Sequence, residues 1–454
     1  MYSSALYRHS PIWLQEILVS ARAGLRKLMR EGRSFRRVVG EIGVTQGYDI
    51  AQLQTLQLEK IRALLGHAYR HVPYYTEAFK KTGITADDIR TLEDVRLLPY
   101  LARPIVVSRS GDLLARNIRG PRIPINTSGS TGTPLRIFQD LKAVIRENAF
   151  IWRQLQWAGF VQGQRRAWIR GDMVVPFENN DRPFWRMNFT EHMLMMSSYH
   201  LSESTAQDYV DALERFNPAL IQAYPSAISY LARYLAAGGR KYTGPNLAAI
   251  VTSSETLTET DREVIESSFG CQVFDYYGSA ERVTMIQTCE RRRYHLASDY
   301  AFTELIPLED GTSEIVGTGF NNWLMPLIRY RSGDTVEMDS DGASCPCGRQ
   351  LPLVKRINGR SDDYLKTWDG RRIGRLDHIF KGVNNVAEGQ LVQNRLDEVI
   401  IRVVPFTGFG ESDRKLLIAN AHERLGKPMR IEVEVTSSIP RTKNGKFRAV
   451  ICNV

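Results

Sequence analysis

Short apolar runs alternate with amphipathic segments in the middle of the chain. Residues 219–224 form an apolar run that predicts a strand, and residues 226–237 then have helical spacing. The same order recurs as a strand at 247–252, a helix at 259–269 and a strand at 272–277. Strands that alternate with helices are typical of a parallel α/β sheet, so we expect this fold class.

The regions on either side of this segment have different patterns. Residues 11–150 have mostly helical spacing, broken by Gly and Pro. Between Phe302 and Met338 short β-type runs are separated by turn residues, which predicts a β-rich subdomain with strands at 303–306, 314–319, 326–334 and 335–338.

A further change of pattern follows the polar turn at residues 359–363. Beyond it we expect strands at 399–405 and 430–436 and a helix at 413–424, which together make a small α+β unit. Polar, glycine-containing turns are typical of domain boundaries and hinges. The prediction is therefore a large N-terminal part, residues 1–360, followed by a small mobile C-terminal domain, residues 361–454.

The first 30 residues contain only short apolar clusters and no signal-peptide cleavage pattern. The series Ile12, Ile17, Leu18, Leu25 and Leu28 is typical of an amphipathic helix, either packed on the protein, which we favour, or lying on a membrane surface. No stretch approaches the roughly 20 apolar residues that a membrane helix needs, so we expect no transmembrane segment.

Composition narrows the function classes. Hydrophobic residues make up 43% of the 454 and charged residues 24%, as in ordinary globular proteins, and the net charge is +10. The basic residues are spread along the chain without a nucleic-acid-binding motif, so we do not expect a nucleic-acid partner. Five cysteines, an odd number, argue against a disulfide framework and favour a reducing, cytoplasmic compartment.

A hydroxyl- and glycine-rich loop, residues 126–134, lies between apolar runs at 123–125 and 135–138. Two glycines let backbone amides turn toward one point, and four hydroxyls add donors for phosphate oxygens. The Gly-Lys-Ser/Thr of a Walker loop is absent. The alternative is a hairpin turn that binds no ligand. The candidate phosphate ligands are Thr127, Ser128, Gly129, Ser130, Thr131 and Gly132.

Two further blocks are suited to the rest of a nucleotide. Tyr276 or Tyr277, at the end of a predicted strand, has the ring to stack on adenine, and Glu281 has the carboxylate to hold Mg²⁺. The carboxylate of Asp334 is suited to accept hydrogen bonds from both ribose hydroxyls. Taken singly, each residue has a structural alternative: buried tyrosines for Tyr276 and Tyr277, a surface acid for Glu281 and a turn residue for Asp334. Their order and spacing favour one nucleotide site.

Three cysteines and a histidine have the composition of a zinc site. Cys289 and His295 are followed about 50 residues later by Cys345 and Cys347. Three thiols and an imidazole match a four-coordinate structural Zn²⁺. The alternative is two unrelated groups of reduced cysteines and a surface histidine. Cys271 and Cys452 are interpreted as packing residues.

In their order along the chain these blocks resemble the superfamily of acyl-CoA synthetases, peptide-synthetase adenylation domains and luciferases. The resemblance covers roughly residues 60–454. Within it, the segments SSETLTET (253–260), CPCGR (345–349) and EGQLVQ (388–393) are similar to phenylacetate–CoA ligase-like proteins of the branch associated with capsular polysaccharide clusters. The segment after Asp363 reads differently from phenylacetate–CoA ligases, which leaves the acid and the use of CoA open.

The resemblance implies roles for several residues. Lys446, in the block IPRTKNGK, takes the place of the lysine that catalyses adenylation, Arg360 that of the junction arginine and Asp362 that of the hinge aspartate. The Tyr-Gly-x-x-Glu block adds Gly278 to the adenine and magnesium site. Family position also implies an acyl pocket, lined by Trp152 or Trp168. The residues near it are Tyr224, Pro225, Ser226, Ser253, Ser254 and Glu255.

The expected reaction follows from these roles. An ATP-dependent ligase with Mg²⁺ forms an acyl-adenylate from a small carboxylic acid and transfers the acyl group to a thiol, with CoA favoured as co-substrate. An amine acceptor in polysaccharide or natural-product assembly is a close alternative, and a degenerate binding protein is a third. Because Lys446, Glu281 and Asp334 are all present, we favour an active enzyme. The sequence leaves a homodimer open.

Overall fold

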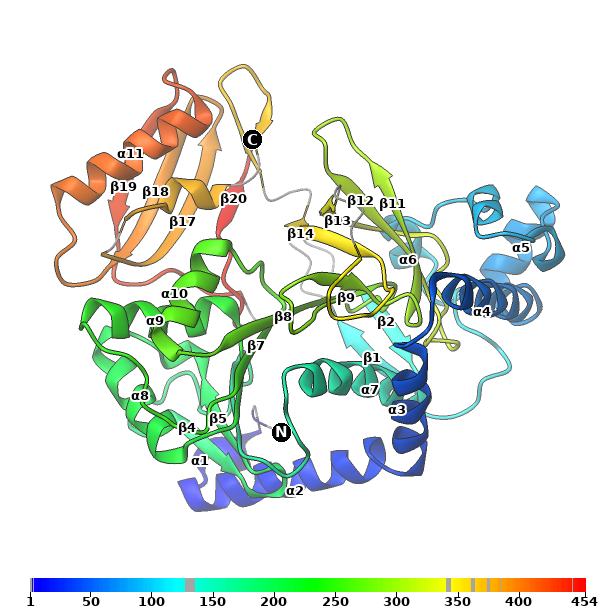
Figure 1. The fold of residues 1–454 in the computed structure, drawn as a ribbon, viewed down its shortest axis with the longest axis horizontal. Helices are drawn as coiled ribbons and strands as arrows, with labels where there is room; N and C mark the ends of the chain where they lie inside the picture. The colour runs from blue at the N-terminus through cyan, green and yellow to red at the C-terminus, as the bar shows by residue number, and fades with distance from the viewer. Residues whose placement is uncertain are drawn as a thin grey trace. The chain divides into compact units, whose positions relative to one another are not determined.

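The computed structural model describes residues 2, 4–126, 135–339, 344–360, 364–373, 376–383, 385–442 and 444–454 (Figure 1). The chain forms two compact units. The first unit contains Met1–Gly24, Gly159–Asp275 and Asn358–Val454, and the second contains Leu25–Ala158 and Tyr276–Ile357. Each unit is therefore assembled from stretches that are far apart in sequence. The mixed α/β class predicted from the sequence is confirmed.

A parallel sheet organises the first unit. Strand β3 (Arg166–Arg170) lies between β5 (Met193–Ser197) and β6 (Leu220–Ala223), parallel to both, and β7 (Ala249–Ser253) continues the sheet beside β6. The edge strand β4 (Trp185–Asn188) is antiparallel to β5. Every residue of β5, β6 and β7 is buried, as expected for strands covered on both faces.

The predicted alternation of strands and helices is confirmed. Helices α8 (Glu203–Phe216), α9 (Pro225–Ala237) and α10 (Glu259–Phe269) connect the strands, and β8 (Gln272–Gly278) follows α10. Pro225 occupies the first turn of α9, where a backbone N–H has no partner in the helix. The Thr258 hydroxyl caps α10 by accepting a hydrogen bond from the Asp261 N–H at 3.0 Å.

The C-terminal part of the first unit has its own sheet, in the order β19–β18–β17–β20. Strands β17 (Val386–Arg395) and β18 (Glu398–Pro405) are antiparallel, β19 (Arg430–Val435) runs parallel to β18, and β20 (Val450–Cys452) runs parallel to β17. Helix α11 (Glu411–Leu425) covers a core shared with β17 and β18. The strands and helix expected in the C-terminal domain are therefore present. A short hairpin and one turn of 3₁₀ helix precede this sheet, with the bounds β15 (Leu365–Lys366), β16 (Arg372–Ile373) and η5 (Leu376–Phe380).

The second unit begins with helices and continues with the predicted β-rich segment. Its strands lie in the order β11–β12–β13–β14–β10–β9. Their bounds are β9 (Met285–Thr288), β10 (Tyr294–Leu296), β11 (Ala301–Pro307), β12 (Ser313–Gly319), β13 (Tyr330–Met338) and β14 (Leu353–Arg360). The larger helices are α3 (Arg33–Thr45), α4 (Ile50–His71), α5 (Pro73–Thr82), α6 (Arg103–Ser108) and α7 (Leu141–Trp157).

One prediction for the β-rich segment is wrong. The separate strands expected at 326–334 and 335–338 are a single strand, β13, that begins only at Tyr330. Gly333, with φ of 73°, lets the chain bend inside the strand, and the pairing register with β12 shifts at the same place. The turn residues therefore mark an irregularity in one strand and not a break between two.

The predicted N-terminal helix is present as α2 (Ile12–Arg30), but its buried face is not the expected one. The buried residues are Gln15, Val19 and Ala23, whereas Ile17, Leu25 and Leu28 of the apolar series are exposed. Gln15 is satisfied where it is buried, because its amide donates to the Tyr7 and Ser10 carbonyls and accepts from Arg186 Nε at 2.6 Å. Hydrogen bonding, which the apolar pattern does not report, therefore sets the orientation of this helix.

Candidate active site

The predicted tyrosine and aspartate meet in the second unit. Strand β8 pairs with β9 through Tyr276, Tyr277 and Gly278, and the Tyr277 hydroxyl donates a hydrogen bond to the Asp334 carboxylate. Burial and the neighbouring Asp334 charge raise the pKa of Tyr277 well above its usual value, so its hydroxyl stays a donor. The ring at the strand end and the proposed ribose acceptor therefore lie side by side.

Glu281 lies close to the same strands. Its carboxylate accepts a hydrogen bond from the Tyr330 hydroxyl at 3.2 Å, and Tyr330 is the first residue of β13, the strand that carries Asp334. The second unit therefore brings together Tyr277, Glu281 and Asp334 near the end of β8 and along β13. A carboxylate, a ring and a second carboxylate fit the magnesium, adenine and ribose roles predicted for them.

A buried ion pair fixes the turn that carries Glu281. Arg282 has φ of 58°, which is unusual for a residue with a side chain, and its guanidinium contacts Glu147 of α7 at 2.6 Å. The Tyr300 hydroxyl donates to the same carboxylate at 2.6 Å. The sequence gives no signal for this network, because an acid on an amphipathic helix is usually a solvated charge and its partners lie more than 130 residues away.

The C-terminal lysine loop, residues 441–447, is held in the first unit by backbone contacts. The Phe447 N–H donates to the Glu255 carboxylate at 2.6 Å, and the Asn444 carbonyl accepts from the Tyr224 hydroxyl at 3.1 Å. Glu255 also accepts from the Ser226 N–H at 3.0 Å. Two of the residues expected near the acyl pocket, Tyr224 and Glu255, therefore contact the loop that carries Lys446.

Two glycines allow this close approach. A Cβ atom built on Gly171 would lie 2.0 Å from the Asn444 carbonyl oxygen, and one on Gly445, where φ is 72°, would lie 2.8 Å from the Gly171 Cα. No side chain fits at either place without displacing backbone. Gly445 belongs to the block that predicted the lysine. Gly171 was not identified from the sequence, because a single glycine after a strand is common in turns that have no special role.

Arg170, at the carboxyl end of β3, is a second residue that was missed. Its guanidinium donates to Ser254 Oγ at 2.6 Å and lies over the rings of Trp168 and Tyr224, 4.9 and 5.1 Å from their centroids. Ser254 has φ of 74°, a strained conformation of the kind that clusters at functional sites. Ligands gather at the carboxyl ends of parallel strands, so this cation is well placed to meet an anionic substrate.

Of the remaining predictions, those for Trp152 and for the strands beside the phosphate loop concern described residues, and the others do not. Trp152 belongs to the second unit and packs against the core around Phe150 and Tyr300. The strands expected on either side of the phosphate loop are present as the antiparallel pair β1 (Ile123–Asn126) and β2 (Arg136–Gln139). Outside the described residues lie the loop itself (Thr127, Ser128, Gly129, Ser130, Thr131 and Gly132), Asp362 and the side chain of Arg360.

The four predicted zinc ligands form one cluster in the second unit. The ligand atoms of Cys289, His295, Cys345 and Cys347 all lie within 4.8 Å of one another. The Sγ atoms of Cys289 and Cys345 are 3.6 Å apart. Two thiolates at 2.3 Å from a tetrahedral zinc lie about 3.8 Å apart, whereas a disulfide needs about 2.05 Å. The cluster therefore fits a tetrahedral metal and not a disulfide.

The histidine is oriented for ligation. His295 Nδ1 lies 3.2 Å from the Leu351 carbonyl, which selects the tautomer with its proton on Nδ1, and Nε2 faces Cys347 Sγ at 3.5 Å. Burial lowers the pKa of His295 to about 4, so the ring is neutral at pH 7 with its lone pair available. Arg349 lies 4.2 Å from the Trp157 ring centroid and pairs with Glu290, which ties the cluster to α7.

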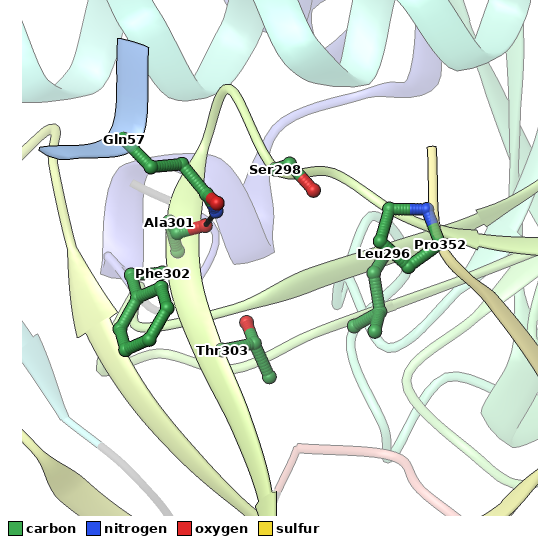
Figure 2. A pocket seen from close by; sticks show the side chains of 7 residues that line it. All are labelled: Gln57, Leu296, Ser298, Ala301, Phe302, Thr303 and Pro352. Atoms are coloured by element: carbon green, nitrogen blue, oxygen red, sulfur yellow. Dashed lines mark hydrogen bonds between the residues drawn. The ribbon is translucent and has the colours of Figure 1, made fainter. Parts of the chain in front are cut away.

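A small pocket in the second unit lies apart from these residues. Its volume is about 70 Å³, well below the roughly 300 Å³ at which small-molecule pockets begin. It has room for a few water molecules only, and it contains none of the predicted site residues. Its lining consists of Gln57, Leu296, Ser298, Ala301, Phe302, Thr303 and Pro352 (Figure 2).

Comparison with known proteins agrees with the sequence blocks and the fold. Residues 365–453 match the CapK C-terminal domain. Protein CapK of Staphylococcus aureus is 26% identical over 99% of this chain and 99% of its own length. A phenylacetate–coenzyme A ligase of Thermus thermophilus is 24% identical over 88% of this chain and 96% of its own length. An indoleacetate–lysine synthetase of Pseudomonas savastanoi is 24% identical over 57% of this chain and 63% of its own length.

A solved structure with the same fold is a 2-hydroxyisobutyryl-CoA ligase in its postadenylation state, in complex with R3-HIB-AMP. It superposes with a TM-score of 0.70 at 19% identity, and the match covers 89% of this chain and 90% of that one. The ordered motifs, the relatives that match along most of the chain and the shared fold agree with one another. They support the family resemblance found in the sequence, to the phenylacetate–CoA ligase-like branch of the adenylate-forming ligase superfamily.

Proposed function

We propose that this protein activates a carboxylic acid with ATP and transfers the acyl group to a thiol, with CoA as the favoured acceptor. The observation that carries the proposal is the docking of the loop around Lys446 onto Tyr224 and Glu255. This docking gives a mobile cation a defined place beside residues expected to meet the acid. The relatives that match most of this chain include a CoA ligase, which supports the thiol acceptor.

The first step is attack of a carboxylate oxygen of the acid on the α-phosphorus of ATP. The bond from that phosphorus to the bridging oxygen breaks, so pyrophosphate leaves and an acyl-AMP anhydride remains. Lys446 and Arg360 lower the barrier by neutralising charge that builds up on the phosphoryl oxygens. Thr127, Ser128, Gly129, Ser130, Thr131 and Gly132 bind the departing phosphates.

Tyr277 and Asp334 hold the nucleoside, with Tyr276 and Gly278 beside them in β8. Mg²⁺ at Glu281 neutralises the triphosphate when it is bound. The ion pair of Arg282 with Glu147 positions Glu281, because it keeps the turn that carries Glu281 in its unusual backbone conformation. These roles rest on the family blocks and on the contacts among these side chains.

In the second step a thiolate attacks the acyl carbon and the carbon–oxygen bond to AMP breaks. AMP leaves and a thioester forms. We assign the boundary near residue 360, with Asp362 as hinge, so that the small domain of residues 361–454 can carry Lys446 away between the steps. In this proposal the hydrogen bonds of the lysine loop to Tyr224 and Glu255 are made and broken in each cycle.

Transfer to an amine is a second candidate. It is favoured by the similarity to an indoleacetate–lysine synthetase. The match to the CapK C-terminal domain in residues 365–453 falls in the segment that departs from phenylacetate–CoA ligases, and it supports a place in capsular polysaccharide synthesis. Both candidates share the adenylate and differ only in the nucleophile. Because ATP and CoA are the proposed substrates, we expect the enzyme to act in the cytoplasm.

The Cys/His cluster, in this proposal, holds a structural Zn²⁺. All four ligand positions of a tetrahedral ion are taken by Cys289, His295, Cys345 and Cys347, which leaves none open for substrate. The metal would therefore stabilise the second unit without taking part in either step.

The test is ATP–pyrophosphate exchange across a panel of aryl, fatty, amino and hydroxy acids. With a responsive acid, Lys446→Ala should lower exchange at least about a hundredfold and still bind ATP, because the cation acts on the transition state. Lys427→Ala, an exposed lysine of the same domain, is the matched control and should retain exchange. Exchange that survives in Lys446→Ala contradicts the assignment. AMP release that depends on CoA or on an amine then decides the acceptor.

A further inference from the structure

Helix α2 turns an apolar face to solvent. Trp13, Ile17, Leu25 and Leu28 are 62, 51, 63 and 80% exposed, and Ala21 is exposed between them. These positions are three or four residues apart, so they form one stripe along the helix. We call the set Trp13, Ile17, Ala21, Leu25 and Leu28 the N-terminal apolar face.

The other side of α2 is already occupied by protein. Val19 and Ala23 are buried, and Gln15 is held by its hydrogen bonds. The Met187 N–H donates to Glu16 and the Phe189 N–H donates to Ser20 Oγ, which anchors the helix along the edge strand β4 and the turn that follows it. The helix therefore has a fixed orientation, and the N-terminal apolar face cannot turn inward without breaking these bonds.

Exposed basic side chains follow in the same segment of the chain. Arg22 and Arg26 are exposed on α2, and Arg33, Arg36 and Arg37 are exposed at the start of α3. From residue 12 to residue 37 seven basic residues stand against two acidic ones, a net charge of +5 in a short segment. They are Arg22, Arg26, Lys27, Arg30, Arg33, Arg36 and Arg37 against Glu16 and Glu31.

The charge decides which partner fits. Two copies of this chain meeting through α2 would bring two strongly basic segments together, which costs Coulomb energy. An anionic lipid surface complements the charge and also receives the apolar side chains. Among the described residues no helix is long and apolar enough to cross a membrane, so insertion would stop at the interface. We propose that the N-terminal apolar face inserts into the headgroup region of an anionic bilayer, with the flanking arginines on lipid phosphates.

The test is flotation of the full-length protein with vesicles of phosphatidylcholine alone or with about one third phosphatidylglycerol. The protein should float with the anionic vesicles. The double variant Trp13→Ser, Leu28→Ser should lower the partition coefficient at least about tenfold, because two exposed apolar groups no longer enter the bilayer. Arg26→Gln should lower it by roughly fivefold on anionic vesicles and leave phosphatidylcholine unaffected.

Val161→Ser removes an equally exposed apolar side chain, 62% exposed, outside α2, and should leave flotation unchanged. Thermal unfolding and pyrophosphate exchange should stay at wild-type levels in all these variants, since none of the residues belongs to the proposed site. Absence of flotation, or equal flotation of wild type and double variant, overturns the proposal. A dimer in solution that the double variant dissociates also overturns it, because a second copy would then cover the face.

Discussion

The lysine loop and the Cys/His cluster both join distant parts of the chain, but by different means. The loop around Lys446 is held by single hydrogen bonds to backbone groups and by the absence of side chains at Gly171 and Gly445. The cluster is built from four side chains, three of them buried, whose atoms converge on one point. Releasing the loop breaks these hydrogen bonds and separates Phe447 from the core of the first unit, whereas opening the cluster separates four side chains of the second unit, three of them buried.

This difference between the lysine loop and the cluster predicts that the loop affects catalysis and the cluster affects stability. Contacts that are weak, local and dependent on shape suit a segment that must arrive and leave in each cycle. Contacts that converge on a metal add their free energy to folding. Changes in the lysine loop should therefore lower the rate and spare the melting temperature, and changes in the cluster should do the reverse.

The largest effect is expected for Gly171→Ala. The new methyl group would meet the Asn444 carbonyl at 2.0 Å, so the lysine loop could not dock. We expect pyrophosphate exchange to fall about a hundredfold, the size of effect that a displacement of about 1 Å has on a catalytic group. The melting temperature should not change.

The matched control is Gly40→Ala, where nothing lies within 4 Å of the added methyl group on α3. It should keep full exchange and unfold at the same or a slightly higher temperature. A Gly171→Ala enzyme with normal exchange would show that the loop does not dock there during adenylation.

The second effect concerns the cluster. Cys345→Ser removes one of the four predicted ligands, so zinc measured by elemental analysis should fall well below one per chain. The melting temperature should fall by at least about 5 °C. Exchange measured well below the melting temperature should stay close to wild type. Cys271→Ser, a cysteine outside the cluster, should keep its zinc. If wild-type protein purified without chelators contains no zinc, the prediction of a structural zinc in this cluster is wrong.

A smaller effect is expected for Glu255→Gln. The amide keeps one acceptor oxygen but presents an NH₂ group to one of the two N–H donors, from Phe447 and Ser226. Exchange should fall about tenfold, the factor that 1.4 kcal/mol gives. Glu259→Gln, whose side chain is 74% exposed, is the control and should have no effect. An equal loss of exchange in both variants would show that the loss of one negative charge lowers exchange, and not the loss of the Glu255 contact with the lysine loop.

The smallest effect is a pH dependence from the same residue. Burial raises the pKa of Glu255, against the opposing effect of its hydrogen bonds from Phe447 and Ser226. Between the unfolded value of about 4.3 and the raised folded value, the folded state binds more protons than the unfolded state, so stability falls as pH rises. Urea unfolding of wild type and Glu255→Gln should show the wild type losing stability relative to the variant from about pH 4.3 upward. A difference that stays constant with pH contradicts the raised pKa.

Local pattern determined much of this protein. The alternation of strands and helices between residues 219 and 277 follows from apolar periodicity, and the helix at 259–269 has the predicted bounds. The four cysteine and histidine positions of the cluster were also predicted, as was a shared nucleotide site for the strand-end tyrosines and Asp334, because ligand chemistry limits which residue types can serve.

Tertiary structure decided the rest. Which face of α2 is buried depends on Arg186, the need for glycine at residue 171 depends on Asn444, and the orientation of Glu281 depends on Glu147. Each pair is separated by more than 130 residues. Periodicity reports only whether a side chain suits an apolar or a polar environment, and it carries no information about which distant group will supply that environment.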